Sequence, residues 1–374
     1  MLDRRACLKS IGGLAGLAAL NGAEGAVAAD PAPKTETGKS RLPGPYRGRV
    51  VAVQSPNAIR QGVYQPETVQ QMMRRGMMEL TGADDWVAAW KQFVSPGERV
   101  GIKVNPVGQP HVISDASVVR EIIAGLEAAG VKRTDIVVYD RYRAEFFKAG
   151  FDKWLPEGVR TSNAAEKYDD IQQDITGYDP EHYFDLPLTL PGYELDNVAA
   201  RRSYAAKFIT QEVDKLINLP VLKDHQSAGV TLCLKNLSHG LVNNVCRSHG
   251  TRSLNACNMF IPAAVSLPVI RNKVVLNILD GIKGLYHGGP GAHLEFVWEH
   301  QTLYFGTDPV AIDRIGWEVI DAKRLSVGMP KLVEDKPDRF STFVHRQPEH
   351  VEIAGALGLG EWNREKIDLR SLRV

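Results

Sequence analysis

The sequence predicts an α/β fold with a mixed, largely parallel sheet, flanking helices and an irregular insertion. The main observation is a strand at 99–104, an amphipathic helix at 117–129 and a buried strand at 135–139, in that order. This order is a βαβ unit, and such a unit joins parallel strands. Apolar runs at 215–219 and 273–279 indicate further buried strands.

Residues 1–28 have the layout of a twin-arginine export signal. Arg4 and Arg5 precede an apolar run at 11–20, and small residues follow as a cleavage site. This run is about half of the roughly 20 residues that span a bilayer, so we expect no stable membrane insertion after cleavage. The expected location is the periplasm, with the twin-arginine machinery as a partner. Residues 29–47 are interpreted as a Pro-rich linker.

Composition limits the possible functions. The 374 residues carry 45 Lys and Arg against 44 Asp and Glu, a formal net charge of +1. Cleavage after residue 28 removes three basic and two acidic residues, which leaves a neutral chain. Nucleic-acid binding needs a basic excess or stripe, so we expect no nucleic-acid partner. We predict one domain at 48–360, followed by a C-terminal tail at 361–374.

Three cysteines follow the signal: Cys233, Cys246 and Cys257. Their spacings are 13 and 11, and the sequence contains no Cys-x-x-Cys pair. We therefore expect neither an iron–sulfur cluster nor a structural zinc of the usual spacing. In an oxidising compartment two of these cysteines could form one disulfide, which would leave the third as a free thiol.

The first half of the domain alternates strands and helices. Residues 49–53 are a β-branched run that predicts a strand, and we expect helices at 66–80 and 84–93. The helix at 117–129 has apolar residues at helical spacing and stops at Gly130.

Polar residues follow the strand that ends near residue 104. The two-residue alternation of a strand puts Lys103 and Asn105 on the same face. The segment 158–202 is rich in Pro, Asp and Tyr. We interpret it as an insertion, with a hairpin at 186–190 and 193–195 that covers the site.

The most informative stretch is 219–244. Pro220 has no N–H to donate to a central strand, so the strand before it should end there. Lys223 and His225 then lie just past a strand end. In open α/β sheets, ligands bind in the crevice beyond the carboxyl ends of the strands.

The same stretch continues as a short helix or a second buried segment at 230–241. It carries Lys235, Asn236 and His239 in an otherwise apolar sequence. Buried cationic and amide groups need partners, which favours an anionic ligand. The alternative is that the lysines reach water from a helix surface.

The strand at 273–279 delivers Asp280 and then a glycine-rich loop at 284–293. This loop lacks the Gly-x-x-x-x-Gly-Lys and Gly-x-Gly-x-x-Gly signatures, so we assign no nucleotide site. The loop also offers a candidate set of metal ligands, although solvated loop histidines are the alternative. These ligands are His287, His293 and Glu295.

A last strand at 302–305 precedes a helix that runs to residue 320. Asp308 is suited to its N-cap and Pro309 to its first position. Capping alone accounts for Asp308, and a ligand role would be an addition. Asp313 lies inside this helix.

Five motifs occur together in one order. They are Ile-Lys-Val-Asn at 102–105, Asn-Leu-Pro-Val-Leu-Lys-Asp-His at 218–225, Gly-Val-Thr-Leu-Cys-Leu-Lys-Asn at 229–236, Asn-Ile-Leu-Asp-Gly at 277–281, and Gly-Thr-Asp-Pro-Val-Ala-Ile-Asp at 306–313. In these motifs the chain resembles the DUF362 family from about residue 49 to 360. The family is named for having no settled function, so the resemblance implies a site more firmly than a reaction. Many relatives carry a ferredoxin-like iron–sulfur module, and this chain lacks its cysteine pairs.

The residues and the resemblance predict a periplasmic enzyme that binds a small anionic molecule, a carboxylate or a phosphate. His225 is the candidate general acid or base, because histidine titrates near neutrality. Asp280 and Asp308 would orient it or hold a divalent cation. The residues assigned to catalysis are Lys223, His225, Lys235 and Asp280, and those assigned to substrate binding are Lys103, Asn105, Asn236, Asp308 and Asp313.

Two other classes of function remain open. One is a non-catalytic periplasmic binding protein or cofactor chaperone that uses the same crevice. The other is an oxidoreductase that borrows a separate cofactor or partner.

Overall fold

The computed structural model describes residues 41–253 and 255–374. The predicted export signal and most of the predicted linker lie outside the described residues. Within these ranges, none of the helices has the length and apolar character needed to cross a bilayer.

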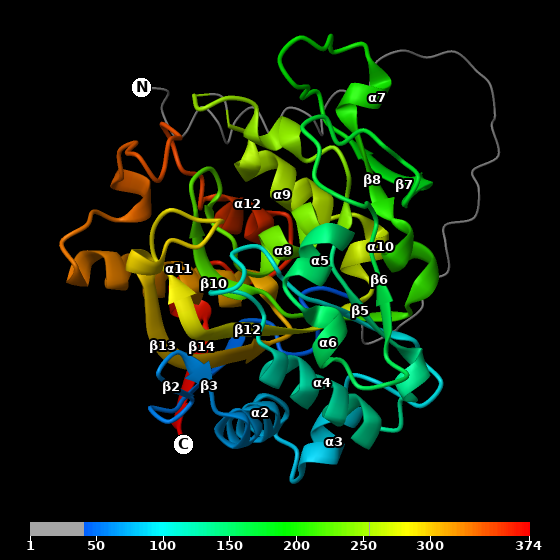
Figure 1. The fold of residues 1–374 in the computed structure, drawn as a ribbon, viewed down its shortest axis with the longest axis vertical. Helices are drawn as coiled ribbons and strands as arrows, with labels where there is room; N and C mark the ends of the chain where they lie inside the picture. Colours follow the sequence, from blue (N-terminus) through cyan, green and yellow to red (C-terminus); the bar gives the residue numbers. More distant parts are fainter. Residues whose placement is uncertain (1–40, 254) are drawn as a thin grey trace. The chain divides into compact units, whose positions relative to one another are not determined.

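The described part of the chain is organised around one mixed sheet, as predicted (Figure 1). Its strands run in the order β14 (Asp368–Arg373), β1 (Arg49–Gln54), β13 (Val297–Gly306), β12 (Val274–Leu285), β9 (Lys215–Asn218), β4 (Val100–Lys103), β5 (Ile136–Tyr139) and β6 (Arg160–Ser162). From β12 to β6 every neighbouring pair is parallel. β13 is antiparallel to both of its neighbours, whereas β14 pairs parallel with β1.

Helices cover both faces of this sheet (Figure 1). One face is covered by α2 (Pro66–Thr81), α3 (Trp86–Lys91), α4 (Ala116–Ala128), α5 (Arg143–Lys148) and α6 (Phe151–Trp154). The other face is covered by α8 (Leu232–Leu241), α9 (Cys257–Val265), α10 (Pro268–Arg271), α11 (Pro309–Ser326) and α12 (His350–Ala356). Each layer has its own cluster of buried apolar side chains against the sheet. The fold is therefore a three-layer α/β arrangement, which confirms the predicted class.

Short elements complete the structure. They are strands β2 (Ile59–Arg60), β3 (Val63–Tyr64), β10 (Val221–His225) and β11 (Gly229–Val230), helix α7 (Val198–Arg201), the π-helix η3 (Phe208–Glu212), and the short 3-10 helices η2 (Arg133–Asp135), η4 (Cys246–His249), η5 (Leu294–Phe296), η6 (Leu332–Glu334) and η7 (Arg364–Lys366).

Two helices begin for the reasons that the sequence gives. In α4, the side chain of Asp115 accepts a hydrogen bond from Ser117 N, at 2.8 Å. In α11, Asp308 accepts from Val310 N and Ala311 N at 3.0 and 2.9 Å, with a proline at the first position. A side-chain acceptor satisfies backbone N–H groups that have no partner within the helix. The predicted cap of α11 is confirmed.

The strand before Pro220 ends as predicted, because β9 stops at Asn218. The expectation that Lys223 and His225 lie past a strand end is wrong, because they belong to a new strand, β10, which pairs parallel with the second half of β12. Pro220 marks the change of neighbour, and its carbonyl accepts from Asp280 N at 2.9 Å. Because β12 continues to residue 285, Asp280 lies inside a strand instead of at the start of a loop.

The insertion and the two ends of the domain also differ from the prediction. The hairpin of the insertion is formed by β7 (Tyr178–Asp185) and β8 (Arg202–Ala206), not by 186–190 and 193–195. The predicted tail contains β14 at the edge of the main sheet. In the predicted linker, Leu42 is buried and its N–H donates to Arg271 O at 2.9 Å.

Candidate functional site

A cavity of about 540 Å³ lies where β4 and β5 end, beside β10 and α8. Lys103 is the last residue of β4, and Asp140 and Arg141 directly follow β5. The insertion adds Tyr168, Asp170, Gln172 and Leu190 to the lining. The sheet edge is the one where α/β proteins bind ligands.

Six of the predicted site residues line this cavity. They are Lys103, Asn105, Lys223, His225, Lys235 and Asn236. They come from three separate motifs, which the parallel strands and α8 bring together.

Lys103 forms a buried ion pair that belongs to the framework of the cavity. Its Nζ lies 2.6 Å from Asp140 Oδ1 and 3.1 Å from Asn236 Oδ1. Burial lowers the pKa of Lys103, and the charge of Asp140 opposes this effect. Lys103 is thus held by protein partners.

Asn236 ties α8 to the sheet. Its Oδ1 also accepts from Asn105 Nδ2 at 3.1 Å, and its Nδ2 donates to Asn218 Oδ1 at 2.8 Å. Asn218 in turn donates to Asn277 Oδ1 at 2.9 Å. Because protein groups already satisfy its amide, Asn236 positions the lysines around it and has little capacity left for a ligand.

Lys223 is completely buried and donates to neutral acceptors. Its Nζ lies 2.8 Å from Asn105 Oδ1 and also donates to Val107 O. Burial, together with the charges of Lys235 and Lys103, lowers the pKa of Lys223 to about 7. Its amine can therefore gain or lose a proton near neutral pH.

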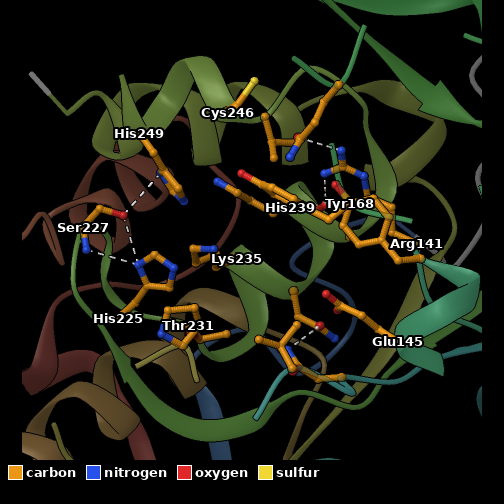
Figure 2. A pocket seen from close by; sticks show the side chains of 18 of the residues that line it. Arg141, Glu145, Tyr168, His225, Ser227, Thr231, Lys235, His239, Cys246 and His249 are labelled. Carbon is orange, nitrogen blue, oxygen red and sulfur yellow. Dashed lines mark hydrogen bonds between the residues drawn. The ribbon is translucent and has the colours of Figure 1, made fainter. Parts of the chain in front are cut away.

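Lys235 is the central side chain of the cavity (Figure 2). It is 8% exposed, and its ammonium has no hydrogen-bond or ion-pair partner among residues 41–253 and 255–374. Burial lowers the pKa of Lys235 to about 8. Figure 2 shows it between His225 and His249 on one side and Arg141 and Glu145 on the other. An amine in this position is available to a ligand.

Arg141 adds a third cation without a carboxylate partner in the described part of the chain. Its guanidinium donates to Tyr178 Oη, Gln172 Oε1 and the carbonyl of His239, at 3.1, 2.7 and 3.1 Å. Arg141 was missed by the sequence analysis. The signal was available, since Arg141 lies near the end of the predicted strand at 135–139, just as Lys103 and Asn105 lie near the end of the strand at 99–104.

Glu145 was also missed, and it faces the cavity from α5 (Figure 2). Its Oε2 is buried without a hydrogen-bond partner in the described residues. Burial raises the pKa of Glu145, and Asp140 adds to this effect while Lys223 opposes it. The carboxyl group and the Lys223 amine thus influence each other across the cavity.

His225 is held as a neutral imidazole. Its Nδ1 accepts from the backbone N–H groups of Ser227 and Ala228, both at 3.2 Å. A nitrogen that accepts two N–H bonds carries no proton, so the proton of the neutral ring is on Nε2. Burial lowers the pKa of His225 well below its usual value. This environment favours a hydrogen-bond donor over the predicted general acid or base.

The three predicted aspartates lie outside the cavity, where protein groups account for them. Asp280 accepts from Tyr64 Oη and Asp115 N, at 3.0 and 3.1 Å. Asp308 caps α11 as described above. Asp313 accepts from two backbone N–H groups at the start of α8. The expectation that Asp280 and Asp308 orient His225 is wrong, because neither touches it.

The predicted metal ligands of the glycine-rich loop do not come together either. His287 lies 2.7 Å from Asp338 Oδ2 and 3.0 Å from Arg324 through its two ring nitrogens. The carboxylate of Glu295 lies on the surface near Arg339, at 3.9 Å. Among the described residues, the three do not form a metal-binding cluster. The cysteines at 233, 246 and 257 are all free, so no disulfide joins any of them.

Fold and cavity together define a three-layer α/β protein with a cation-lined pocket at a parallel sheet edge. The sequence pattern of the family described as "Domain of unknown function (DUF362)" matches residues 100–318. This match covers more than half of the chain, and the chain belongs to this family. The predicted resemblance is confirmed.

Other comparisons add little. No curated protein matches the chain. Among solved structures, the chain is similar to a Thermotoga maritima protein determined by the Northeast Structural Genomics Consortium, with 13% identity and a TM-score of 0.43. The similar region covers 72% of this chain and 61% of that chain.

Proposed function

We propose that the cavity binds a small anionic molecule through Arg141, Lys223 and Lys235. The observation that carries this proposal is that three buried cations line one cavity without a carboxylate partner among the described residues. A buried unpaired cation is unfavourable, so a site that gathers three of them is suited to an anion. Phosphate and carboxylate groups have the charge and the acceptor oxygens for this role.

We further propose acid–base chemistry on the bound molecule. Glu145 and Lys223 are the candidate proton-transfer groups, because each is accessible from the cavity and each has a perturbed pKa. His225 would donate a hydrogen bond to the ligand from Nε2. This assignment replaces the sequence-based hypothesis of proton transfer by His225.

Binding can be tested by calorimetry at pH 7 with inorganic phosphate, pyrophosphate, succinate and citrate as separate probes. We expect at least one probe to bind, and Lys235→Gln to weaken it by at least tenfold. Lys132→Gln is the matched control, since Lys132 is exposed and lies outside the cavity. A wild-type protein that binds none of these probes would refute the proposal.

Turnover separates an enzyme from a binding protein. The bound probe is incubated with the protein and followed by NMR. Conversion that is lost in Glu145→Gln, with binding retained, supports the enzyme. Tight binding with an unchanged probe supports the non-catalytic alternative.

Export remains a proposal based on residues 1–28. We propose that Arg4 and Arg5 direct twin-arginine export to the periplasm. The experiment is cell fractionation of the full chain beside a variant in which both arginines are lysine. The variant should remain in the cytoplasm, and equal export of both proteins would exclude this route.

A further inference from the structure

Three potential metal ligands meet beside the cavity, outside the set of cations. They are His239 on α8, His249 at the end of η4 and Cys257 at the start of α9, and their ligand atoms all lie within 4.8 Å of one another. His249 Nδ1 lies 3.1 Å from Cys257 Sγ. The two imidazole rings are stacked, with their centroids 5.0 Å apart.

Hydroxyl groups hold these side chains in place. Ser248 Oγ lies 3.0 Å from His239 Nε2, 3.0 Å from His249 Nδ1 and 3.9 Å from Cys257 Sγ. Ser227 Oγ lies 3.3 Å from His249 Nδ1. These serine hydroxyls contact the ring nitrogens that face the cluster, so a bound metal would replace these contacts. On His239 the other nitrogen, Nδ1, lies 3.0 Å from Ser238 Oγ, and a hydrogen bond at that position fixes the tautomer of a ligating imidazole.

The dimensions of the cluster suit a tetrahedral ion. Bonds of about 2.0–2.1 Å to nitrogen and about 2.3 Å to sulfur place the ligand atoms of such a set roughly 3.3–3.6 Å apart. The observed separations, from 3.1 Å to at most 4.8 Å, bracket these values, so small side-chain adjustments suffice. Two imidazoles and a thiolate favour borderline and soft ions over Mg²⁺ and Ca²⁺, which prefer oxygen ligands.

We propose that His239, His249 and Cys257 bind one transition-metal ion of the Zn²⁺ type, with a fourth position open to the cavity. His239 and His249 line the cavity, whereas Cys257 is completely buried. A site with three protein ligands and one open position is the arrangement of catalytic zinc centres. The metal would lie on the wall formed by α8 and η4, within electrostatic range of Lys235.

This inference goes beyond the proposed anion binding, because it involves different side chains and needs no anion. The test uses the whole protein, stripped of metal with a chelator and titrated with Co²⁺ and then Zn²⁺ in a buffer without phosphate or carboxylate. We expect one equivalent of Co²⁺ to bind with a thiolate-to-cobalt charge-transfer band, and Zn²⁺ to displace it.

Matched variants assign the ligands. Cys257→Ser should abolish the charge-transfer band, and His249→Gln should weaken Co²⁺ binding by at least tenfold. Cys246→Ser is the control, since Cys246 also lines the cavity but its Sγ contacts the carbonyl of Ile171. Circular dichroism verifies that each variant is folded. A wild-type protein without the band, or a band that survives Cys257→Ser, would overturn the proposal.

Discussion

At residue 223, a charged group is buried where an apolar one would be more stable. Lys223 is fully buried, and its pKa of about 7 lies below the value of about 10.5 in an unfolded chain. Between pH 7 and 10.5 the unfolded state therefore binds more protons, so this residue makes stability rise with pH. The full cost of burying the Lys223 ammonium is present below pH 7.

Lys223→Met should therefore stabilise the protein at pH 6.5. A pKa shift of this size lowers the free energy of unfolding by roughly 5 kcal/mol when the lysine is protonated. The orphaned acceptors, Asn105 Oδ1 and the Val107 carbonyl, cost about 1–3 kcal/mol in return. The measurement is urea unfolding at pH 6.5, 8 and 9.5, with Lys132→Met as the control. The advantage of the variant should shrink as pH rises, and a variant that is equally destabilised at every pH would contradict this account.

Lys235 gives a second pH dependence, this time in binding. Burial lowers the pKa of Lys235 to about 8, so its ammonium loses a proton above that pH and attraction for an anion falls. Sulfate is a suitable probe because its own charge is constant from pH 6.5 to 9.5. We expect sulfate affinity to fall at least tenfold across this range in the wild type. In Lys235→Arg, which keeps its charge, only the fall near pH 7 that comes from Lys223 should remain. An equal fall above pH 8 in both proteins would assign the effect to another group.

Lysines at the sheet edge could be predicted from sequence, because they stand beside apolar runs with recognisable ends. The aspartates could not be assigned in the same way. The local sequence around a carboxylate at a helix start is the same whether that carboxylate caps the helix or binds a ligand. Asp308 illustrates this ambiguity. The metal cluster has no short motif, since His239, His249 and Cys257 lie on three elements and only the packing of α8 against α9 brings them together.

At the scale of elements, α8 is the part on which the cavity depends. It carries Lys235 and Asn236, and at Gly240 it approaches the sheet so closely that an added Cβ would overlap Lys103 Cε. The first residues of α8 are held by a residue that lies far along the chain. Asp313 on α11 accepts from Cys233 N and Leu234 N, at 2.7 and 2.9 Å.

Asp313→Ala should loosen this helix. The two N–H groups lose their acceptor in a buried place, which costs about 1–3 kcal/mol for each unsatisfied group. We expect lower stability in urea unfolding and weaker anion binding in calorimetry, since Lys235 moves with α8. Glu318→Ala is the control on the same helix, because its ion pairs are partly exposed and contribute about 0–1 kcal/mol. Unchanged anion binding in Asp313→Ala would show that the cavity does not depend on this contact.

Element types were easier to predict than partners. The helix at 117–129 and the strand at 135–139 have clear periodicity, and the structure contains α4 and β5 there. Pro220 ends one strand as expected, but β10 pairs with residues of β12 that lie about 60 positions further along the chain, such as Asp280 opposite Val221. The sequence around β10 does not indicate which strand it pairs with. The hairpin was misplaced because β7 is largely exposed and has weak alternation.

At the scale of the whole domain, a strand near the start of the described chain and a strand at its end pair to complete one side of the sheet. β1 near the start of the described chain pairs with β14 at its end, over six residue pairs. Leu372 packs on one face of the sheet and Leu369 on the other, against separate clusters of buried side chains. Arg370, which is half-exposed, and Arg373, which is exposed, interrupt this segment, and for that reason it resembles a tail in the sequence.

Removal of residues 368–374 should therefore destabilise the whole domain, although these residues lie far from the cavity in sequence. Without β14, the N–H and C=O groups on one side of β1 lose their partners, and an exposed strand edge promotes association with other chains. We expect a lower midpoint of urea unfolding and increased light scattering on gentle heating. Arg373→Ser is the control, since this side chain is exposed and the backbone pairing remains. A truncated protein that unfolds at the wild-type midpoint and stays monomeric would mean that β14 is dispensable, and that β1 and β13 already form a sufficient edge.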